Sequence, residues 1–330
     1  MEDPENGLNE PFYMVRHKGL HLPGPLTKGD KIGIVTLSGY KPDEVMGAMA
    51  VIASHGFVPV LSRLIQNSDV NSDLLPRGER ISELYYMIED SEIKAIFCCG
   101  DGSGSIEMLP NFSYGPIARN PKWLVGNGDV TALLSMWVVS DIASIYGPMC
   151  MDLVSRGAGV KLLFNLLTSG GKLDYLLPSS PDSRKGKAIG RLVGGNLSVL
   201  TILGETSYDL VKLFTGYKNG EKGIILVVED SDVPLTKVRD MLLKFYLNNV
   251  MSFVKGLIFG SFNNCEHYGH LHSIRDVVEE LEERLMIPPG IPVAFGFPIG
   301  MDTPNIPLVE GLEVELEVSD NLVALRASKS

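Results

Sequence analysis

Short apolar runs alternate with helical patterns along most of the chain. The apolar runs are rich in β-branched side chains, which predicts buried strands. Between them, helical patterns begin at Pro42 and Arg80, and the first of these ends at Gly56, a typical C-cap residue. Strands separated by helices predict a parallel, doubly wound sheet with ligand-binding loops at the carboxyl ends of its strands. The segments that we expect to form strands are 32–35, 57–61, 95–99, 123–125, 144–146, 188–193, 223–228, 254–259 and 292–295.

The chain divides near its middle. A segment rich in Gly, Pro and Ser separates the two series of strands, and we interpret residues 166–187 as a linker. The polar residues 1–27 predict an irregular N-terminal arm. We therefore expect an α/β fold with a Rossmann-like N-terminal domain, built on a parallel sheet, over residues 28–165. A C-terminal α/β domain over residues 188–330 is expected to contain parallel strands and a terminal β-hairpin from Leu312 to Arg326.

One strand is predicted to run through a tight turn directly into a helix. Its apolar residues 123–125 stop at Gly126-Asn127-Gly128, and Asp129 opens an apolar helical pattern. A strand, a strained turn and a helix N-terminus form the geometry of a nucleophile elbow, in which a Ser side chain stands beside free backbone N–H groups. Here the residue at the apex is Gly128, which has no side chain that could attack a substrate.

Composition limits the classes of partner. The net charge of −11 argues against nucleic acid, because phosphate binding needs clustered Lys and Arg. The chain contains no run of 18 apolar residues, so we expect no membrane span. Its first residues lack the basic start and apolar core of a secretory signal. The adjacent Cys98 and Cys99 lie in an apolar run, so buried free thiols are expected rather than disulfides. These features predict a soluble, cytoplasmic protein.

Seven segments carry a resemblance to a known family. They are Gly29–Gly39, Lys94–Gly104, Gly126–Thr131, Tyr146–Met149, Gly194–Leu197, Leu226–Asp230 and Gly296–Gly300. In this order they resemble the serine LD-carboxypeptidase family, which includes the microcin C immunity peptidases. The resemblance covers nearly all of residues 28–325. It implies a homodimer and a pocket for a peptide terminus, such as a murein tetrapeptide ending in D-Ala or a peptidyl-adenylate.

The Ser–Glu–His triad of that family is incomplete in this chain. In the family the Ser attacks the amide carbonyl, the His is the general base, and the Glu orients the His. The resemblance places the Glu position at Glu229, the Ser position at Gly128 and the His position at Met301. A thioether does not accept a proton at neutral pH, so both the nucleophile and the base are missing. Two further positions differ, since the family's loop Arg is Gly100 here and the His of its His-Gly-Pro-Met segment is Tyr146.

The backbone part of such a site needs no reactive side chain. The N–H of Asp129 at the helix start and one from the loop glycines, with Gly102 as the first candidate, would suffice to hold a carboxylate or a carbonyl. Loss of a triad nucleophile or base costs on the order of a million-fold in turnover. We therefore interpret the chain as a catalytically degenerate member that binds a peptide-like or amino-acyl ligand, with no cofactor. Two alternatives stay open: a hydrolase that uses groups outside the family pattern, and a structural or regulatory homodimer with a vestigial pocket.

A His-rich segment is a separate candidate site. Cys265, His267, His270 and His272 are competent transition-metal ligands, and they follow the predicted strand 254–259. Their spacing matches no zinc pattern, so an exposed helix entry is the alternative interpretation. The same segment could instead supply a replacement for the missing general base. We assign no metal and keep these four residues as candidates.

Overall fold

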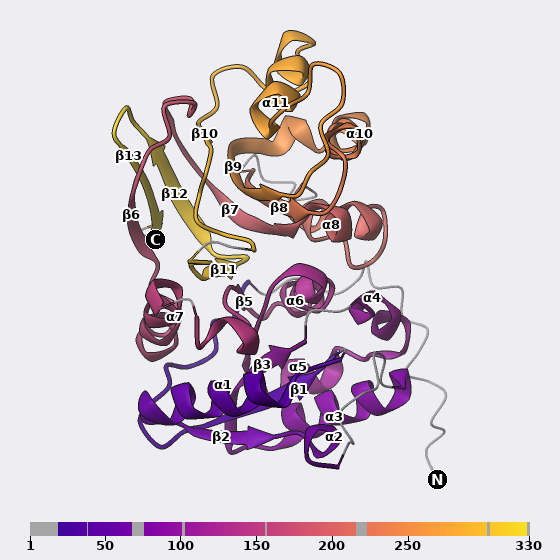
Figure 1. Cartoon of the computed structure of the whole chain (residues 1–330), viewed down its shortest axis with the longest axis vertical. Helices are drawn as coiled ribbons and strands as arrows, with labels where there is room; N and C mark the ends of the chain where they lie inside the picture. Colours follow the sequence, from indigo (N-terminus) through magenta and orange to yellow (C-terminus); the bar gives the residue numbers. More distant parts are fainter. Residues whose placement is uncertain are drawn as a thin grey trace.

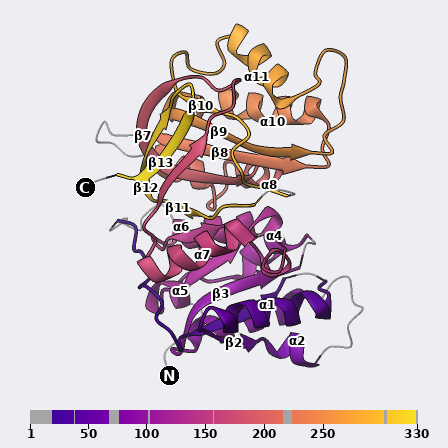
Figure 2. The same cartoon turned by 60° about the vertical axis from the view of Figure 1, so that its left-hand side comes forward.

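The computed structural model contains two sheets, one in each half of the molecule (Figure 1). It describes residues 19–37, 39–67, 76–100, 103–155, 157–215, 223–301 and 304–328. Helices pack around both sheets, and the α/β fold class predicted from the sequence is confirmed. The turned view in Figure 2 shows the two halves meeting along α6 and β11.

The elements of the first half follow the predicted alternation closely. They are β1 (Lys31–Thr36), α1 (Pro42–Ser54), β2 (Val58–Leu61), α2 (Arg63–Asn67), α3 (Arg77–Glu89), β3 (Ile93–Cys99), α4 (Ser105–Met108), η2 (Leu109–Asn111), α5 (Gly115–Arg119), β4 (Trp123–Gly126), η3 (Gly128–Val130), α6 (Thr131–Val139), β5 (Ser144–Tyr146), η4 (Cys150–Asp152) and α7 (Gly157–Ser169).

The elements of the second half include two short strands and a hairpin at the end. They are β6 (Asp174–Pro178), β7 (Gly186–Asn196), α8 (Leu197–Leu203), α9 (Leu210–Thr215), β8 (Ile224–Ser231), α10 (Leu235–Leu247), η5 (Met251–Phe253), β9 (Val254–Asn263), α11 (Ile274–Glu283), β10 (Val293–Ala294), β11 (Leu308–Glu310), β12 (Glu313–Val318) and β13 (Leu322–Ala327).

The first sheet has the strand order β11-β5-β4-β3-β1-β2. Its strands are parallel except β11, which comes from the end of the chain and pairs antiparallel with β5. Apolar side chains line both faces because helices cover both, as expected for parallel strands. Trp123 in β4 and Trp137 in α6 are fully buried. The Trp123 indole donates to the carbonyl of Gly24, so the described part of the N-terminal arm packs on this half.

The second sheet has the order β10-β9-β8-β7-β12-β13-β6. The first four strands are parallel, and the remaining pairs are antiparallel. The terminal hairpin is confirmed as β12 and β13. Residues 174–178, which lie within the segment interpreted as a linker, form β6 and pair with β13. Residues 166–187 are therefore not an irregular connection throughout, although composition alone favours one.

Two pairs of strand ends position the site. Gly126 at the end of β4 lies opposite Tyr146 at the end of β5. Asn196 at the end of β7 lies opposite Glu229 near the end of β8. The N–H of Asn196 donates to Thr131 Oγ1 of α6 at 3.1 Å, which ties the second sheet to the helix after the elbow. The carboxyl ends of strands from both sheets thus meet at one place, as ligand-binding α/β proteins arrange them.

The state of the thiols agrees with the expectation from composition. All four cysteines are free, and Cys98, Cys99 and Cys150 are buried, which confirms the expected buried thiols. Within the described residues, no helix has both the length and the apolar character required to cross a membrane.

Candidate functional site

The elbow has the backbone that the sequence predicts. β4 ends at Gly126, Asn127 is extended, and Gly128 adopts φ +54° as the first residue of the helical turn η3, which leads into α6. The Asn127 side chain fixes the turn, because its Nδ2 donates to the Gly147 carbonyl at 3.2 Å and to Asp152 Oδ2 at 3.1 Å. A Cβ placed on Gly128 would meet no atom within 4 Å. The apex of the elbow is therefore open space.

Tyr146 connects the elbow to the second sheet. Its hydroxyl donates to Glu229 Oε1 at 2.6 Å and accepts from the Gly128 N–H at 3.3 Å. The ring is 1 % exposed, and burial raises the pKa of Tyr146 well above its ordinary value of 10. The phenol therefore stays protonated at neutral pH and acts as a hydrogen-bond donor to the carboxylate.

Glu229 is a buried carboxyl group at the edge of the second sheet. It is 2 % exposed, and its Oε1 also accepts from Asn196 Nδ2 at 3.3 Å. Burial raises the pKa of Glu229 from 4.5 to about 7, while the hydrogen bonds from Tyr146 and Asn196 oppose that rise. Within the described residues, Glu229 Oε2 has no hydrogen-bond partner. Near neutral pH this group is divided between its charged and neutral forms.

Asp230 and Asn196 form the polar support behind Glu229. Asp230 Oδ2 accepts from the N–H and the hydroxyl of Ser198, and its Oδ1 accepts from Asn196 Nδ2 at 3.0 Å. Asn196 also caps α8, because its Oδ1 accepts from the Val199 N–H at 3.1 Å. The side-chain amide of Asn196, which donates to Glu229, is thus held by hydrogen bonds at both its nitrogen and its oxygen.

Met301 lies in the connection between β10 and β11, directly after Gly300. Its side chain is 45 % exposed, and its Sδ lies 3.6 Å from Ser231 Oγ. Its carbonyl accepts from Ser261 Oγ at 3.1 Å and from Asn263 Nδ2 at 2.8 Å. These bonds fix the backbone of the loop, while the thioether stays at the surface of the cavity described next.

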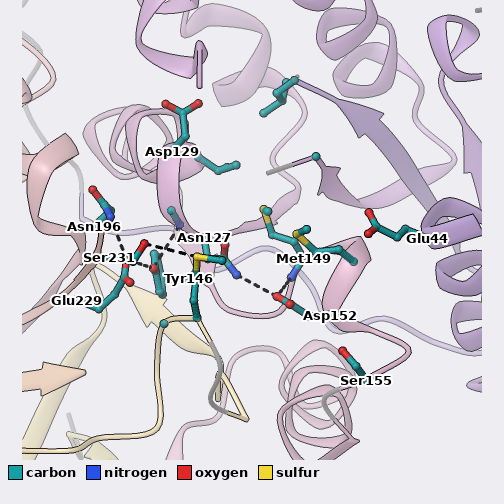
Figure 3. A pocket seen from close by; sticks show the side chains of 17 residues that line it. Glu44, Asn127, Asp129, Tyr146, Met149, Asp152, Ser155, Asn196, Glu229 and Ser231 are labelled. Atoms are coloured by element: carbon teal, nitrogen blue, oxygen red, sulfur yellow. Dashed lines mark hydrogen bonds between the residues drawn. The ribbon is translucent and has the colours of Figure 1, made fainter. Parts of the chain in front are cut away.

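A cavity of about 260 Å³ collects these groups (Figure 3). Gly128, Asp129, Glu229 and Met301, which the sequence singled out, all line it, whereas Gly102 lies outside the described residues. Sequence reasoning missed other lining residues, of which Asn196 had a signal, since it precedes an apolar helical pattern as an N-cap residue does. The full lining comprises Leu37, Glu44, Gly100, Asn127, Gly128, Asp129, Val130, Tyr146, Met149, Met151, Asp152, Ser155, Asn196, Glu229, Ser231, Gly300 and Met301.

The His-rich segment lies outside this lining. The rings of His267 and His272 are in edge-to-face contact with centroids 5.5 Å apart, and His270 Nε2 lies 3.2 Å from Glu280 Oε2. Among the described residues, no three His, Cys, Asp or Glu side chains are grouped closely enough to hold a metal ion. Neither Cys265 nor the three histidines reach the cavity wall. In the described structure these four candidates therefore lie apart from the elbow.

Comparison with known proteins identifies the family. Residues 32–147 match the LD-carboxypeptidase N-terminal domain, and residues 189–316 match the LD-carboxypeptidase C-terminal domain. The chain belongs to the LD-carboxypeptidase family. A probable murein peptide carboxypeptidase of Bacillus subtilis is 25 % identical over 324 residues, covering 94 % of this chain and 96 % of the relative.

An immunity protein is among the curated relatives, and solved structures share the fold of this chain. The microcin C7 self-immunity protein MccF of Escherichia coli is 23 % identical over 344 residues, covering 92 % of this chain and 95 % of MccF. The structure of MccF in complex with aspartyl sulfamoyl adenosine has a TM-score of 0.77 at 21 % identity and covers 93 % of this chain and 99 % of that one. A muramoyltetrapeptide carboxypeptidase from Oxalobacter formigenes has a TM-score of 0.75 at 21 % identity and covers 91 % of this chain and 99 % of that one.

Proposed function

We propose that the protein binds a peptide-like or amino-acyl ligand in the cavity and does not cleave it by the family's serine mechanism. One observation carries the proposal: Gly128, Glu229 and Met301 line the same cavity. The resemblance assigns these three positions to the triad, and only Glu229 has a group that can exchange a proton at neutral pH.

The remaining geometry supports binding. The elbow turn is intact, the cavity is open at Gly128, and a buried carboxyl group is held in place by Tyr146 and Asn196. Murein peptide carboxypeptidases and an MccF bound to aspartyl sulfamoyl adenosine are among the relatives, which supports a peptide or amino-acyl group as the ligand. The resemblance also implies a homodimer, and we include this in the proposal.

A hydrolase that uses other groups is the main rival. The His-rich segment does not support it, because none of its four candidates reaches the cavity. Ser155 and Ser231 line the cavity, and Ser231 is the first hydroxyl to test because it follows Glu229 by two residues on β8. Ser231→Ala is therefore the variant that would expose a nucleophile outside the family pattern.

The experiment pairs an activity assay with a binding assay on the purified full chain. Release of D-Ala from a murein tetrapeptide is expected to stay at background, while the tetrapeptide or aspartyl sulfamoyl adenosine raises the melting temperature. A ligand at about 100 times its Kd stabilises the native state by about 2.7 kcal/mol. Turnover near about 1 per second or faster would overturn the proposal, and its loss in Ser231→Ala would identify the nucleophile. If neither compound shifts the melting temperature, the vestigial-pocket alternative replaces the proposal.

A further inference from the structure

Three methionines lie in the cavity wall, and they differ in how much water reaches them. Met149 is 4 % exposed, Met151 is half-buried, and Met301 is 45 % exposed. Met46 on α1 is exposed as well, but it does not line the cavity. Among the described residues, Met301 is therefore the methionine that combines an exposed side chain with a place in the wall of the site.

The surrounding backbone holds this thioether at the wall. Two side chains of β9, Ser261 and Asn263, donate to the Met301 carbonyl. The preceding residue, Gly300, packs so closely against Ser261 and Glu229 that it has no room for a Cβ. The loop is thus fixed on both sides of the Met301 Cα. A chemical change in the Met301 side chain therefore acts on the cavity, because the loop has little freedom to shift and absorb it.

The sulfur atom is in contact with a hydroxyl group of the same wall. Met301 Sδ lies 3.6 Å from Ser231 Oγ, and Figure 3 draws this contact as a dashed line from Ser231. Ser231 lies at the end of β8, two residues after Glu229, and both residues line the cavity. A thioether is a weak hydrogen-bond acceptor. Oxidation to the sulfoxide would replace it by a polar, chiral group at the same place.

We propose that Met301 is an oxidation site through which hydrogen peroxide regulates ligand binding in the cavity. This inference rests on the proposed function, because it concerns the regulation of the same site. A lone pair of Sδ attacks one oxygen of the peroxide, so that an S–O bond forms and the O–O bond breaks. The departing oxygen takes the proton of the transferred oxygen and leaves as water. The sulfur loses two electrons and the peroxide gains them, so the step needs no other reagent.

The sulfoxide changes the wall in two ways. It adds an oxygen atom to a space of about 260 Å³, and it places a strong acceptor where a ligand covers a thioether. A bound ligand without a donor at that point would bury the new oxygen unsatisfied, so oxidation should weaken binding by about tenfold. Methionine sulfoxide reductases, one for each epimer, reverse the change. Two thiols then supply the electrons and become a disulfide, while the oxygen leaves as water.

The test measures oxidation and binding on the same samples of the full chain. Hydrogen peroxide is followed by dithiothreitol, which reverses disulfides at thiols such as the half-buried Cys265 but leaves sulfoxides in place. Peptide mapping by mass spectrometry then locates each added oxygen, and Met301 should gain it faster than Met149 and Met151. Calorimetry with a murein tetrapeptide and with aspartyl sulfamoyl adenosine should show dissociation constants raised about tenfold. Treatment with both reductases should restore them.

Three variants assign the response to one sulfur, and each variant is compared with itself before and after peroxide. Met301→Leu keeps a similar volume but has no sulfur to oxidise, so peroxide should no longer change either dissociation constant. Met46→Leu, outside the cavity, and Met151→Leu, inside it, should keep the tenfold response. A response that persists in Met301→Leu, or one that disappears in Met151→Leu, would overturn the inference.

The inference and the proposed function fail in different measurements. If a probe binds the untreated protein and its dissociation constant is unchanged after Met301 has gained oxygen, the inference is wrong and the proposed function stands. If neither probe binds the untreated protein, the proposed function fails. The peptide map still tests the oxidation site in that case, and a Met301 that gains oxygen no faster than the buried Met149 would contradict the inference by itself.

Discussion

The cavity-lining glycines Gly128 and Gly300 come one from each half of the molecule, and they have opposite reasons to be glycine. Gly128 at the elbow has φ +54°, and a Cβ there would meet nothing within 4 Å. Gly300 has φ +98°, and a Cβ there would stand 2.4 Å from Ser261 Oγ and 2.9 Å from Glu229 Oε2. Packing excludes a side chain at Gly300 but leaves room for one at Gly128.

The comparison distinguishes a position where a side chain would not fit from one where a side chain would fit but the reactive group is absent. At Gly300 the missing side chain makes room for the Glu229 carboxyl group. At Gly128 the only local reason for glycine is the left-handed backbone, which costs other residues about 1–2 kcal/mol. A serine would fit the space at the elbow, so its absence concerns chemistry more than packing.

Replacement at the crowded turn should have the largest effect. We expect Gly300→Ala to lower the free energy of unfolding by about 3–4 kcal/mol, from overpacking together with the positive φ. Because the new methyl group would push against Glu229 and Ser261, ligand binding should weaken as well. Urea unfolding at pH 7 measures the loss. A decrease below about 1 kcal/mol would mean that the wall yields and that the two turns are alike after all.

A pH-dependent effect of intermediate size tests the carboxyl group that Gly300 accommodates. The pKa of Glu229 is about 7 in the folded protein against an ordinary 4.5, so between these values the folded protein holds a proton that the unfolded chain has released. Stability therefore falls as the pH rises through this window. Glu229→Gln keeps acceptors for Tyr146 and Asn196 but carries no charge. Relative to wild type, it should gain up to about 3 kcal/mol at pH 8 and little at pH 4.5.

Glu310 provides the matched control for that measurement. It is also buried, with a pKa raised to about 8 by burial, and it accepts one hydrogen bond from the Gly194 N–H. It does not line the cavity. Glu310→Gln should therefore remove a similar pH-dependent cost, in a window that also begins near pH 4.5 but extends to about pH 8, without changing ligand binding. A wild type and a Glu229→Gln variant with parallel stability curves from pH 5 to 8 would contradict the role given to burial at Glu229.

The sequence predicted the elbow side of the site better than its opposite wall. The Gly126-Asn127-Gly128 turn and the strand that ends near Glu229 both follow from local patterns that tertiary structure did not override. No local sequence pattern marks Asp152 and Glu44 as site residues. They reach the cavity because of how η4 and α1 pack in the fold, and local hydrophobic periodicity does not encode that packing.

Two strands that no sequence pattern indicated, β6 and β11, have a similar explanation. Strand β6 lies between Gly- and Pro-rich stretches, and these turn signals conceal a five-residue strand that is completed only by pairing with β13. Strand β11 has three residues and joins the first sheet from the far end of the chain. A strand of three residues is too short to show a hydrophobic periodicity. Its partner strand is determined by long-range packing rather than by its own sequence.

The smallest effect is expected at the open turn, and it completes the comparison. Gly128→Ser should cost about 1–2 kcal/mol, since only the positive φ opposes it and no neighbour blocks the side chain. The new hydroxyl would enter the cavity that Tyr146 and Glu229 line, but Met301 offers no base to remove its proton, so D-Ala release from a murein tetrapeptide should stay at background. Urea unfolding and the release assay measure the two outcomes. A loss as large as that of Gly300→Ala would show that the elbow also excludes a side chain for steric reasons. Turnover in the single variant would instead mean that a neighbouring group, with Glu229 the first candidate, can act as the base.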